Sequence, residues 1–149
     1  MEFPEEFIKR GNFELHSGGR SDKLYDINTM FMNPEWRDKI ISEVPENRHY
    51  IGIATCGALI GQLVAERRGA IFSMIKDGEL VGSEPKEGYL IIDDVATTGN
   101  SFKKAMSVLL DEGVKYTNAD FYVVVDRRPL DKREFDIGCM FDVGDRNES

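Results

Sequence analysis

Residues 90–101 read Leu-Ile-Ile-Asp-Asp-Val-Ala-Thr-Thr-Gly-Asn-Ser, and this stretch decides the fold class. Its apolar start is typical of a buried strand, and a helical pattern follows over 101–112 and closes at Gly113. Between the two lies a loop rich in hydroxyl groups. Because the backbone N–H groups at a helix N-terminus attract anions, the unit predicts a phosphate cradle rather than an ordinary acidic turn. Asp93 and Asp94 are suited to hold neighbouring ribose hydroxyls or a cation.

The rest of the chain extends this pattern in both directions. Helices alternate with apolar strands, which favours an α/β fold whose mostly parallel sheet is covered on both faces. The length of 149 residues suits one domain. We expect residues 1–45 to form a small hood and residues 46–149 the core. The predicted strands are 50–54, 70–75, 89–95, 119–125 and 137–143, the predicted core helices are 58–68 and 101–112, and the hood has helices at 4–10 and 34–44 with a brief strand at 13–15.

Composition and charge exclude several classes of function. The 19 basic and 27 acidic residues give a net charge of −8, which disfavours binding to nucleic acid. No apolar run reaches the roughly 18 residues that a membrane helix needs, and the acidic N-terminus is unlike a signal peptide. Cys56 and Cys139 lie far apart without a metal-binding pattern, so we expect reduced thiols in the cytoplasm.

The stretch 90–101 resembles the signature with which type I phosphoribosyltransferases bind phosphoribosyl pyrophosphate (PRPP). Only Asn100 departs, at a position that is usually Gly, Ser or Thr, and the lysine of a Walker-type ATPase loop is missing. The resemblance implies the type I phosphoribosyltransferase fold, a mostly parallel twisted sheet flanked by helices. It also implies that Asp93 and Asp94 bind the ribose and act in catalysis, and that the phosphate is held by Ala96, Thr97, Thr98, Gly99, Asn100 and Ser101.

Three further segments resemble the orotate phosphoribosyltransferases. They are Gly11-x-Phe13-x-Leu15-x-Ser17-Gly18-x-x-Ser21, the apolar run 51–58, and Val125-Asp126-Arg127. The second implies a pyrophosphate loop made by Thr55, Cys56 and Gly57. The first and third imply an orotate site, where an arginine can bind a carboxylate bidentately. The residues implied for orotate are His16, Leu24, Tyr25, Thr97 and Arg127.

The same resemblance implies partners and a cofactor. The substrates would be PRPP and orotate, and Mg²⁺ would neutralise the leaving pyrophosphate. Hard cations of this kind contact mainly substrate phosphates, so we expect no dedicated protein metal site. The family is dimeric, which implies a homodimer here.

One segment departs from the family. Residues 75–82 match the mobile loop whose catalytic lysine and histidine reach across the dimer interface of the family to the neighbouring site. Asp77-Gly78 indicates a hairpin or mobile loop there. Lys76 keeps the first lysine and is expected to bind PRPP and act in catalysis. Glu79 and Val81 replace the catalytic lysine and the histidine, and Lys86 is a candidate substitute. Two alternatives therefore stay open, a transferase for another base and a PRPP-binding regulatory protein without catalysis.

Overall fold

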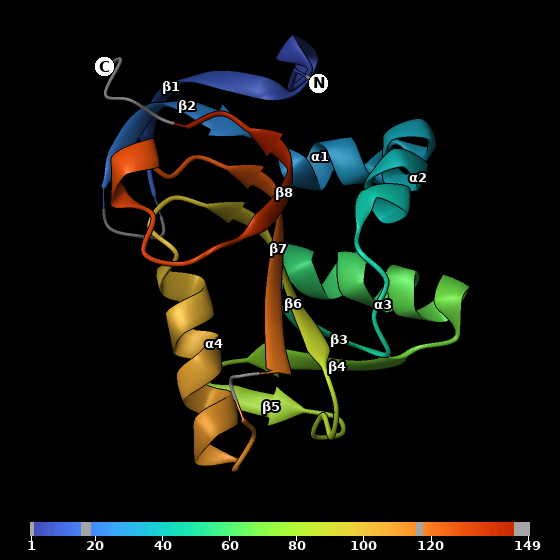
Figure 1. Cartoon of the computed structure of the whole chain (residues 1–149). Coiled ribbons are helices and arrows are strands. Elements are labelled where there is room, and N and C mark those ends of the chain that lie inside the picture. The colour runs from blue at the N-terminus through green and yellow to red at the C-terminus, as the bar shows by residue number, and fades with distance from the viewer. Residues whose placement is uncertain (1, 16–18, 116–117, 145–149) are drawn as a thin grey trace.

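A six-stranded sheet forms the centre of the computed structural model, which describes residues 2–15, 19–115 and 118–144 (Figure 1). The strand order is β5-β4-β3-β6-β7-β8, and all neighbours are parallel except β4 and β5. The predicted mostly parallel α/β architecture is confirmed. The strands are β3 (His49–Ile53), β4 (Ile71–Lys76), β5 (Glu79–Val81), β6 (Tyr89–Ala96), β7 (Ala119–Asp126) and β8 (Gly138–Asp142).

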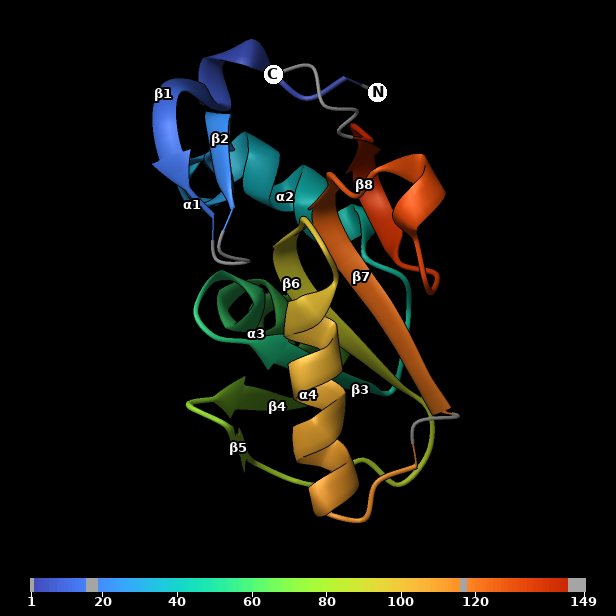
Figure 2. The same ribbon diagram turned by 90° about the vertical axis from the view of Figure 1, so that its left-hand side faces the viewer.

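Helices cover both faces of this sheet, as Figures 1 and 2 show from two directions. Helix α3 (Cys56–Arg68) lies on one face, and α4 (Asn100–Asp111) lies on the other. Side chains alternate along each strand, so Tyr50 joins the apolar cluster beneath α3 while its neighbour Ile51 joins the cluster beneath α4. Two buried cores result, and the continuous apolar run at the start of β6 supplies residues to both.

The N-terminal hood differs from its prediction at one helix. Residues 4–10 were expected to be helical, but the chain makes a 3₁₀ turn (Glu5–Phe7) and then enters strand β1 (Ile8–Glu14). This strand pairs antiparallel with β2 (Arg20–Tyr25). Phe3 packs edge-to-face on Tyr25 and on Phe141, at ring distances of 5.0 and 5.2 Å. The ring of Phe3 is therefore buried between Tyr25 of the hood and Phe141 of β8.

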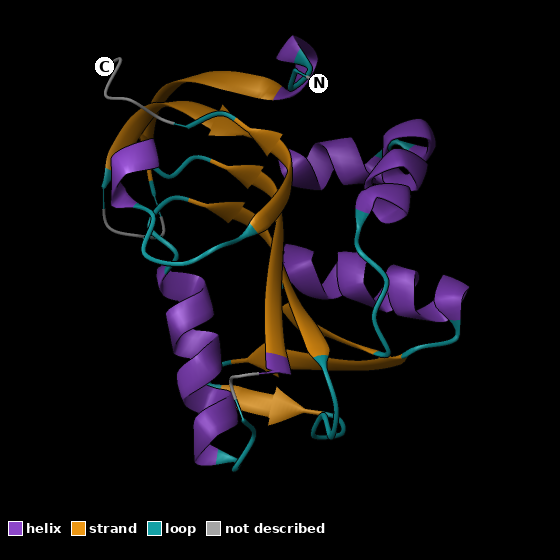
Figure 3. Cartoon of the chain, viewed as in Figure 1, coloured by secondary structure: helices purple, strands orange, loops and turns teal. Residues whose placement is uncertain are grey.

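Two helices complete the hood, as the secondary-structure colouring in Figure 3 shows. Helix α1 (Ile27–Met32) is capped by the Asp26 side chain, which accepts a hydrogen bond from the Thr29 N–H. Helix α2 (Pro34–Glu43) begins with Pro34 after an Asn33 cap, which confirms the helix expected at 34–44. Both helices pack on the α3 side of the core.

The segment expected to be a mobile loop begins as a tight hairpin. β4 and β5 are joined by a two-residue turn, in which Asp77 and Gly78 have φ angles of 51° and 76°. Such a turn matches the natural twist of paired strands and is favoured by Asp-Gly. Lys76 and Glu79 are directly paired across it. The hairpin expected at Asp77-Gly78 is confirmed, and it leaves no long loop at the positions of Glu79 and Val81.

Candidate active site

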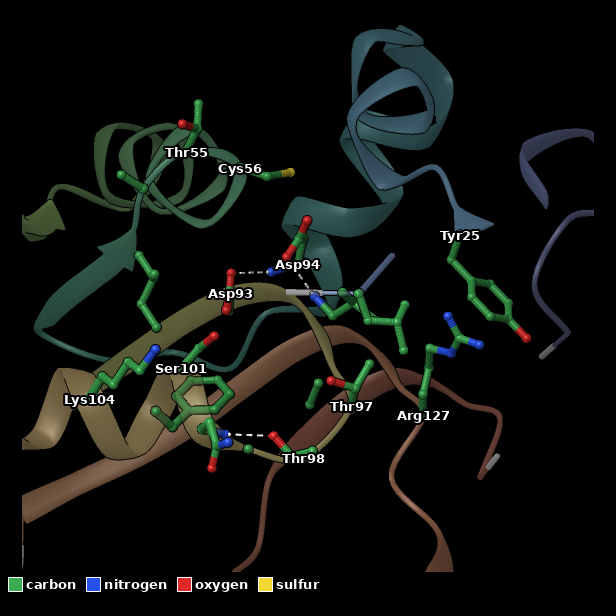
Figure 4. Close-up of a pocket in the computed structure, with 18 of the residues that line it drawn as sticks. Tyr25, Thr55, Cys56, Asp93, Asp94, Thr97, Thr98, Ser101, Lys104 and Arg127 are labelled. Atoms are coloured by element: carbon green, nitrogen blue, oxygen red, sulfur yellow. Dashed lines mark hydrogen bonds between the residues drawn. The ribbon is translucent and has the colours of Figure 1, made fainter. Parts of the chain in front are cut away.

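The predicted site residues gather where the parallel strands end. Because β3, β6 and β7 run in the same direction, the segments that follow them meet at one edge of the sheet. A pocket of about 650 Å³ lies at this edge, beneath the hood (Figure 4). It is lined by Glu14, Leu15, Leu24, Tyr25, Asn28, Ile53, Ala54, Thr55, Cys56, Asp93, Asp94, Val95, Ala96, Thr97, Thr98, Gly99, Asn100, Ser101, Phe102, Lys104 and Arg127.

The acid pair near the end of β6 forms the floor of this pocket. Asp93 is buried, with 8% of its surface exposed, and its carboxylate accepts a hydrogen bond of 2.9 Å from the Asp94 N–H. Burial, together with the neighbouring charge of Asp94, raises the pKa of Asp93 well above its usual value, and a hydrogen bond with Ser101 offsets only part of this rise. The Asp94 carboxylate accepts from the Val95 N–H at 2.8 Å. Asp93 can therefore present a protonated carboxyl group to a ligand.

The loop from Thr97 to Ser101 leads from this pair into α4. The Thr98 hydroxyl accepts a hydrogen bond of 3.2 Å from the Asn100 N–H. Gly99 has a φ of +89°, and a side chain there would approach the Phe135 ring to 2.9 Å. Glycine is therefore required for both conformation and space. The turn brings backbone N–H groups at the start of α4 to the pocket wall, which is the geometry of an anion cradle.

The segment after β3 forms the opposite wall. Thr55 and Cys56 line the pocket where α3 begins. Burial and the carboxylates of Asp94, Asp93 and Asp26 raise the pKa of the Cys56 thiol far above its usual value. The sulfur is thus a neutral wall atom and a poor nucleophile. Gly57 packs against β6, where a Cβ atom would overlap the carbonyl oxygen of Ile92. Its role is to let the helix and strand approach each other.

Arg127 joins the core to the hood. It follows β7, its backbone N–H donates to the Ala96 carbonyl, and only 4% of its surface is exposed. The guanidinium donates to the Ser21 hydroxyl at 2.8 Å and to the Lys23 carbonyl at 3.3 Å, and it lies 4.8 Å from the centre of the Tyr25 ring. Figure 4 shows Arg127 and Tyr25 facing each other at the hood side of the pocket.

The neighbours of Arg127 fix its backbone. Asp126 is fully buried and accepts hydrogen bonds from the backbone and guanidinium of Arg128, with distances of 2.9–3.0 Å. Arg133 adds a second cation 3.7 Å from the same carboxylate. Asp126 therefore belongs to a buried ion network behind the pocket, while Arg127 points to its front.

Most of the predicted site residues are brought together. The pocket lining includes every residue expected from 93–101, along with Thr55, Cys56, Leu24, Tyr25 and Arg127. Lys76 and Gly57 do not belong to the lining. His16, with Ser17 and Gly18, lies outside the described residues. Three further lining residues, Glu14, Asn28 and Lys104, are specified by none of the motifs in the sequence. The spacing of Lys104, three residues after Ser101, is nevertheless a signal that it shares a helix face with the cradle.

The described residues offer few groups for a bound metal ion. Among them, no three His, Cys, Asp or Glu side chains cluster in a way that could hold one. The pocket nevertheless contains two adjacent carboxyl groups, and carboxylate oxygens suit Mg²⁺ when substrate phosphates complete its shell.

In the described part of the chain, no helix is long and apolar enough to cross a bilayer.

Comparison with known proteins relates this site to one family. The chain is 36% identical over 137 residues to the orotate phosphoribosyltransferase of Thermoplasma volcanium, covering 80% of this chain and 78% of that protein. The chain belongs to the orotate phosphoribosyltransferase family. Its relative from Pyrococcus furiosus is 32% identical over 144 residues, covering 85% of this chain and 78% of that orotate phosphoribosyltransferase. A search of protein-family models found no match.

Solved structures agree with the orotate phosphoribosyltransferase assignment. The crystal structure of orotate phosphoribosyltransferase from Aeropyrum pernix superposes with a TM-score of 0.72 at 27% identity, covering 82% of this chain and 77% of that one. An adenine phosphoribosyltransferase from Giardia lamblia, at 19% identity, has a TM-score of 0.65 and covers 92% of this chain and 94% of its own. The latter likeness concerns the fold alone, which confirms the predicted type I phosphoribosyltransferase architecture.

Proposed function

We propose that the protein transfers the phosphoribosyl group of PRPP to orotate, giving orotidine monophosphate and pyrophosphate. The observation that carries this proposal is a single pocket that combines the acid pair of β6, the loop at the start of α4 and Arg127. The first two suit a phosphorylated ribose, and the third suits a carboxylate. Membership of the orotate phosphoribosyltransferase family supports the choice of orotate as the acceptor.

Different residues would bind the 5'-phosphate, the ribose hydroxyls and the pyrophosphate of PRPP. The N–H groups of 97–101, helped by the Thr97, Thr98 and Ser101 hydroxyls, would hold the 5'-phosphate at the start of α4. Asp93 and Asp94 would hold the ribose hydroxyls. Thr55, with the neutral Cys56 beside it, would face the pyrophosphate. These contacts fix the sugar while the bond from its anomeric carbon to pyrophosphate breaks. A bond to a ring nitrogen of orotate forms, and that nitrogen releases its proton to solvent.

Electrostatics would favour that bond exchange. Positive charge develops at the anomeric carbon as pyrophosphate leaves, and the side chain of Asp94 lies in the same pocket. Mg²⁺, carried in by the substrate, would neutralise the departing pyrophosphate. Because no three metal-binding side chains cluster in the described part of the chain, we infer that the ion is held mainly by substrate oxygens. Lys76 remains a proposed catalytic and PRPP-binding residue, although it stands outside the pocket lining.

Orotate would occupy the hood side of the pocket. Arg127 is held between Ser21 and Tyr25, so its guanidinium is already oriented before the substrate arrives. Tyr25 and Leu24 would contact the ring, Thr97 would contact its edge, and His16 belongs to the same proposed set. A homodimer, implied by the family resemblance, and a cytoplasmic location, expected from the cysteine pattern, complete the proposal.

The test is the loss of orotate absorbance in the ultraviolet when protein, PRPP and Mg²⁺ are mixed, with adenine and uracil as competing bases. Orotate turnover that neither base inhibits supports the proposal. Turnover of another base in place of orotate would assign the protein to a different transferase. PRPP binding without turnover of any base would instead favour a regulatory protein.

A further inference from the structure

The charges that line the pocket are poorly matched to an anionic substrate. Three of the five charged lining residues are acidic, namely Glu14, Asp93 and Asp94. Of the two basic ones, Arg127 is engaged with Ser21 and Lys23 of the hood. PRPP carries a monophosphate and a pyrophosphate, so its binding calls for positive charge beside the cradle. The other basic residue of the lining is Lys104.

The hairpin cannot supply that charge from the positions where the family loop carries it. Glu79 and Val81 stand there, and they belong to β5, three residues long and paired with β4. Lys76 precedes the two-residue turn and does not line the pocket. In this chain the acid Glu79 therefore replaces the lysine expected in the loop. The positive charge that PRPP needs has to come from another residue.

Lys104 is positioned to supply this positive charge. It lies three residues after Ser101 and four after Asn100 in α4, so all three share one face of the helix. Side chains lean toward the N-terminus of their helix, which directs the Lys104 amine to the cradle. Figure 4 shows the amine beside Ser101, below the Asp93 carboxyl group.

Lys104 differs from its neighbour Lys103 in its partners, although both side chains are exposed on α4. Lys104 has no ion pair or side-chain hydrogen bond within the described part of the chain. Its neighbour Lys103 is instead paired with Glu134 at 2.9 Å, outside the pocket. An anion in the cradle would give Lys104 the partner that the protein does not.

We propose that Lys104 binds a phosphate group of PRPP and replaces the cation missing from the β4–β5 hairpin. This inference rests on the proposed function. A charge-assisted hydrogen bond from a lysine to a phosphate is strong enough to change affinity by about tenfold. Because the Lys104 side chain is exposed and unpaired in the fold described, its loss should affect the ligand and leave folding intact.

The experiment is calorimetric titration of the full chain with PRPP and Mg²⁺, comparing wild type with Lys104→Gln, Lys104→Arg and the matched control Lys103→Gln. We expect Lys104→Gln to weaken PRPP binding about tenfold, Lys104→Arg to keep most of the affinity, and Lys103→Gln to stay within about twofold of wild type. The melting temperature of Lys104→Gln should stay close to that of wild type, because the side chain is exposed and makes no ion pair within the described part of the chain.

Separate titrations with pyrophosphate and ribose 5-phosphate locate the contact. Weaker binding of either probe to Lys104→Gln supports the inference and identifies the phosphate involved. Equal binding of PRPP and both probes by wild type and Lys104→Gln overturns it, as does an equal loss in Lys103→Gln. If wild type binds no PRPP, the proposed function fails first, so the two failures are distinguishable.

Discussion

The guanidinium of Arg127, at the end of β7, donates a hydrogen bond to the hydroxyl of Ser21 on β2 across 2.8 Å. These residues are separated by 106 positions in the chain, and their contact ties the hood to the sheet edge. The side of the pocket proposed for orotate is therefore assembled from two parts of the fold. Substitutions that break contacts between these parts should weaken the binding of orotate more than that of PRPP.

We expect Ser21→Ala to weaken orotate binding while leaving PRPP binding unchanged. The substitution removes one hydrogen bond that orients the guanidinium, a loss of about 1 kcal/mol, which corresponds to a roughly fivefold increase in KM for orotate. Steady-state kinetics with each substrate varied in turn provides the measurement. An equal rise in KM for PRPP would show that Ser21 acts on the whole pocket instead.

Asp94→Asn should remove most PRPP affinity. The substitution keeps the size of the side chain and replaces a carboxyl group at the proposed ribose site with an amide. We expect a loss of tenfold or more in calorimetric titrations, since hydrogen bonds to charged groups contribute about 1.5–3 kcal/mol. Binding at wild-type strength would rule out the assignment of Asp94 to the ribose hydroxyls.

The raised pKa of Asp93 predicts a pH-dependent stability. The folded state holds a proton on this carboxyl group at pH values where the unfolded chain has released it. The resulting contribution to the free energy of unfolding is therefore complete at acid pH and is lost as the pH rises through the neutral range. Replacement by a neutral amide removes this dependence.

Urea denaturation of wild type and Asp93→Asn, at intervals from pH 5 to pH 8, measures the effect. Relative to wild type, the variant should gain stability with increasing pH, by about 1–3 kcal/mol over the range. A constant difference between the two proteins at every pH would mean that Asp93 titrates normally.

Gly99→Ala should destabilise the cradle. The residue needs a φ of +89°, and the added methyl group would meet the Phe135 ring. We expect a decrease of about 1–3 kcal/mol in the free energy of unfolding, together with weaker PRPP binding. Gly113→Ala is the matched control, because Gly113 also has a positive φ but has open space around its Cα. Equal stability losses in the two variants would show that the contact with Phe135 adds nothing.

The double substitution Glu79→Lys and Val81→His restores the residues of the family loop in sequence. Because the tight hairpin holds both positions in strand β5, outside the pocket lining, we expect orotate turnover to change less than about twofold. Initial-rate measurements decide the matter. A large increase in turnover would show that this hairpin reaches a catalytic centre.

The core of the fold was predictable because its signals are local. The apolar run before Asp93 and the helical pattern after Ser101 each lie within one element, and both are confirmed as β6 and α4. The hood was harder to predict. Phe3 and Phe7 have helical spacing, yet Ile8 pairs with Tyr25 in a hairpin, and pairing across that distance leaves no local signal.

The site also has parts with a local sequence signal and parts that depend on long-range contacts. The acid pair and the loop that follows it are contiguous in sequence, so they could be recognised together. The contact of Arg127 with Ser21 depends on how the hood folds over the sheet, which the sequence pattern does not specify. Lys104 was missed because a lysine on an amphipathic helix is usually a solvated residue, and only the position of the pocket distinguishes it from Lys103.

The proposed transfer is tested most directly by the release of pyrophosphate from PRPP, measured against the consumption of orotate in the same reaction. We expect one pyrophosphate for each orotate consumed, dependence on both substrates, and loss of the signal in Asp94→Asn. Absence of pyrophosphate with wild-type protein, or its release with adenine and not with orotate, would rule out transfer to orotate.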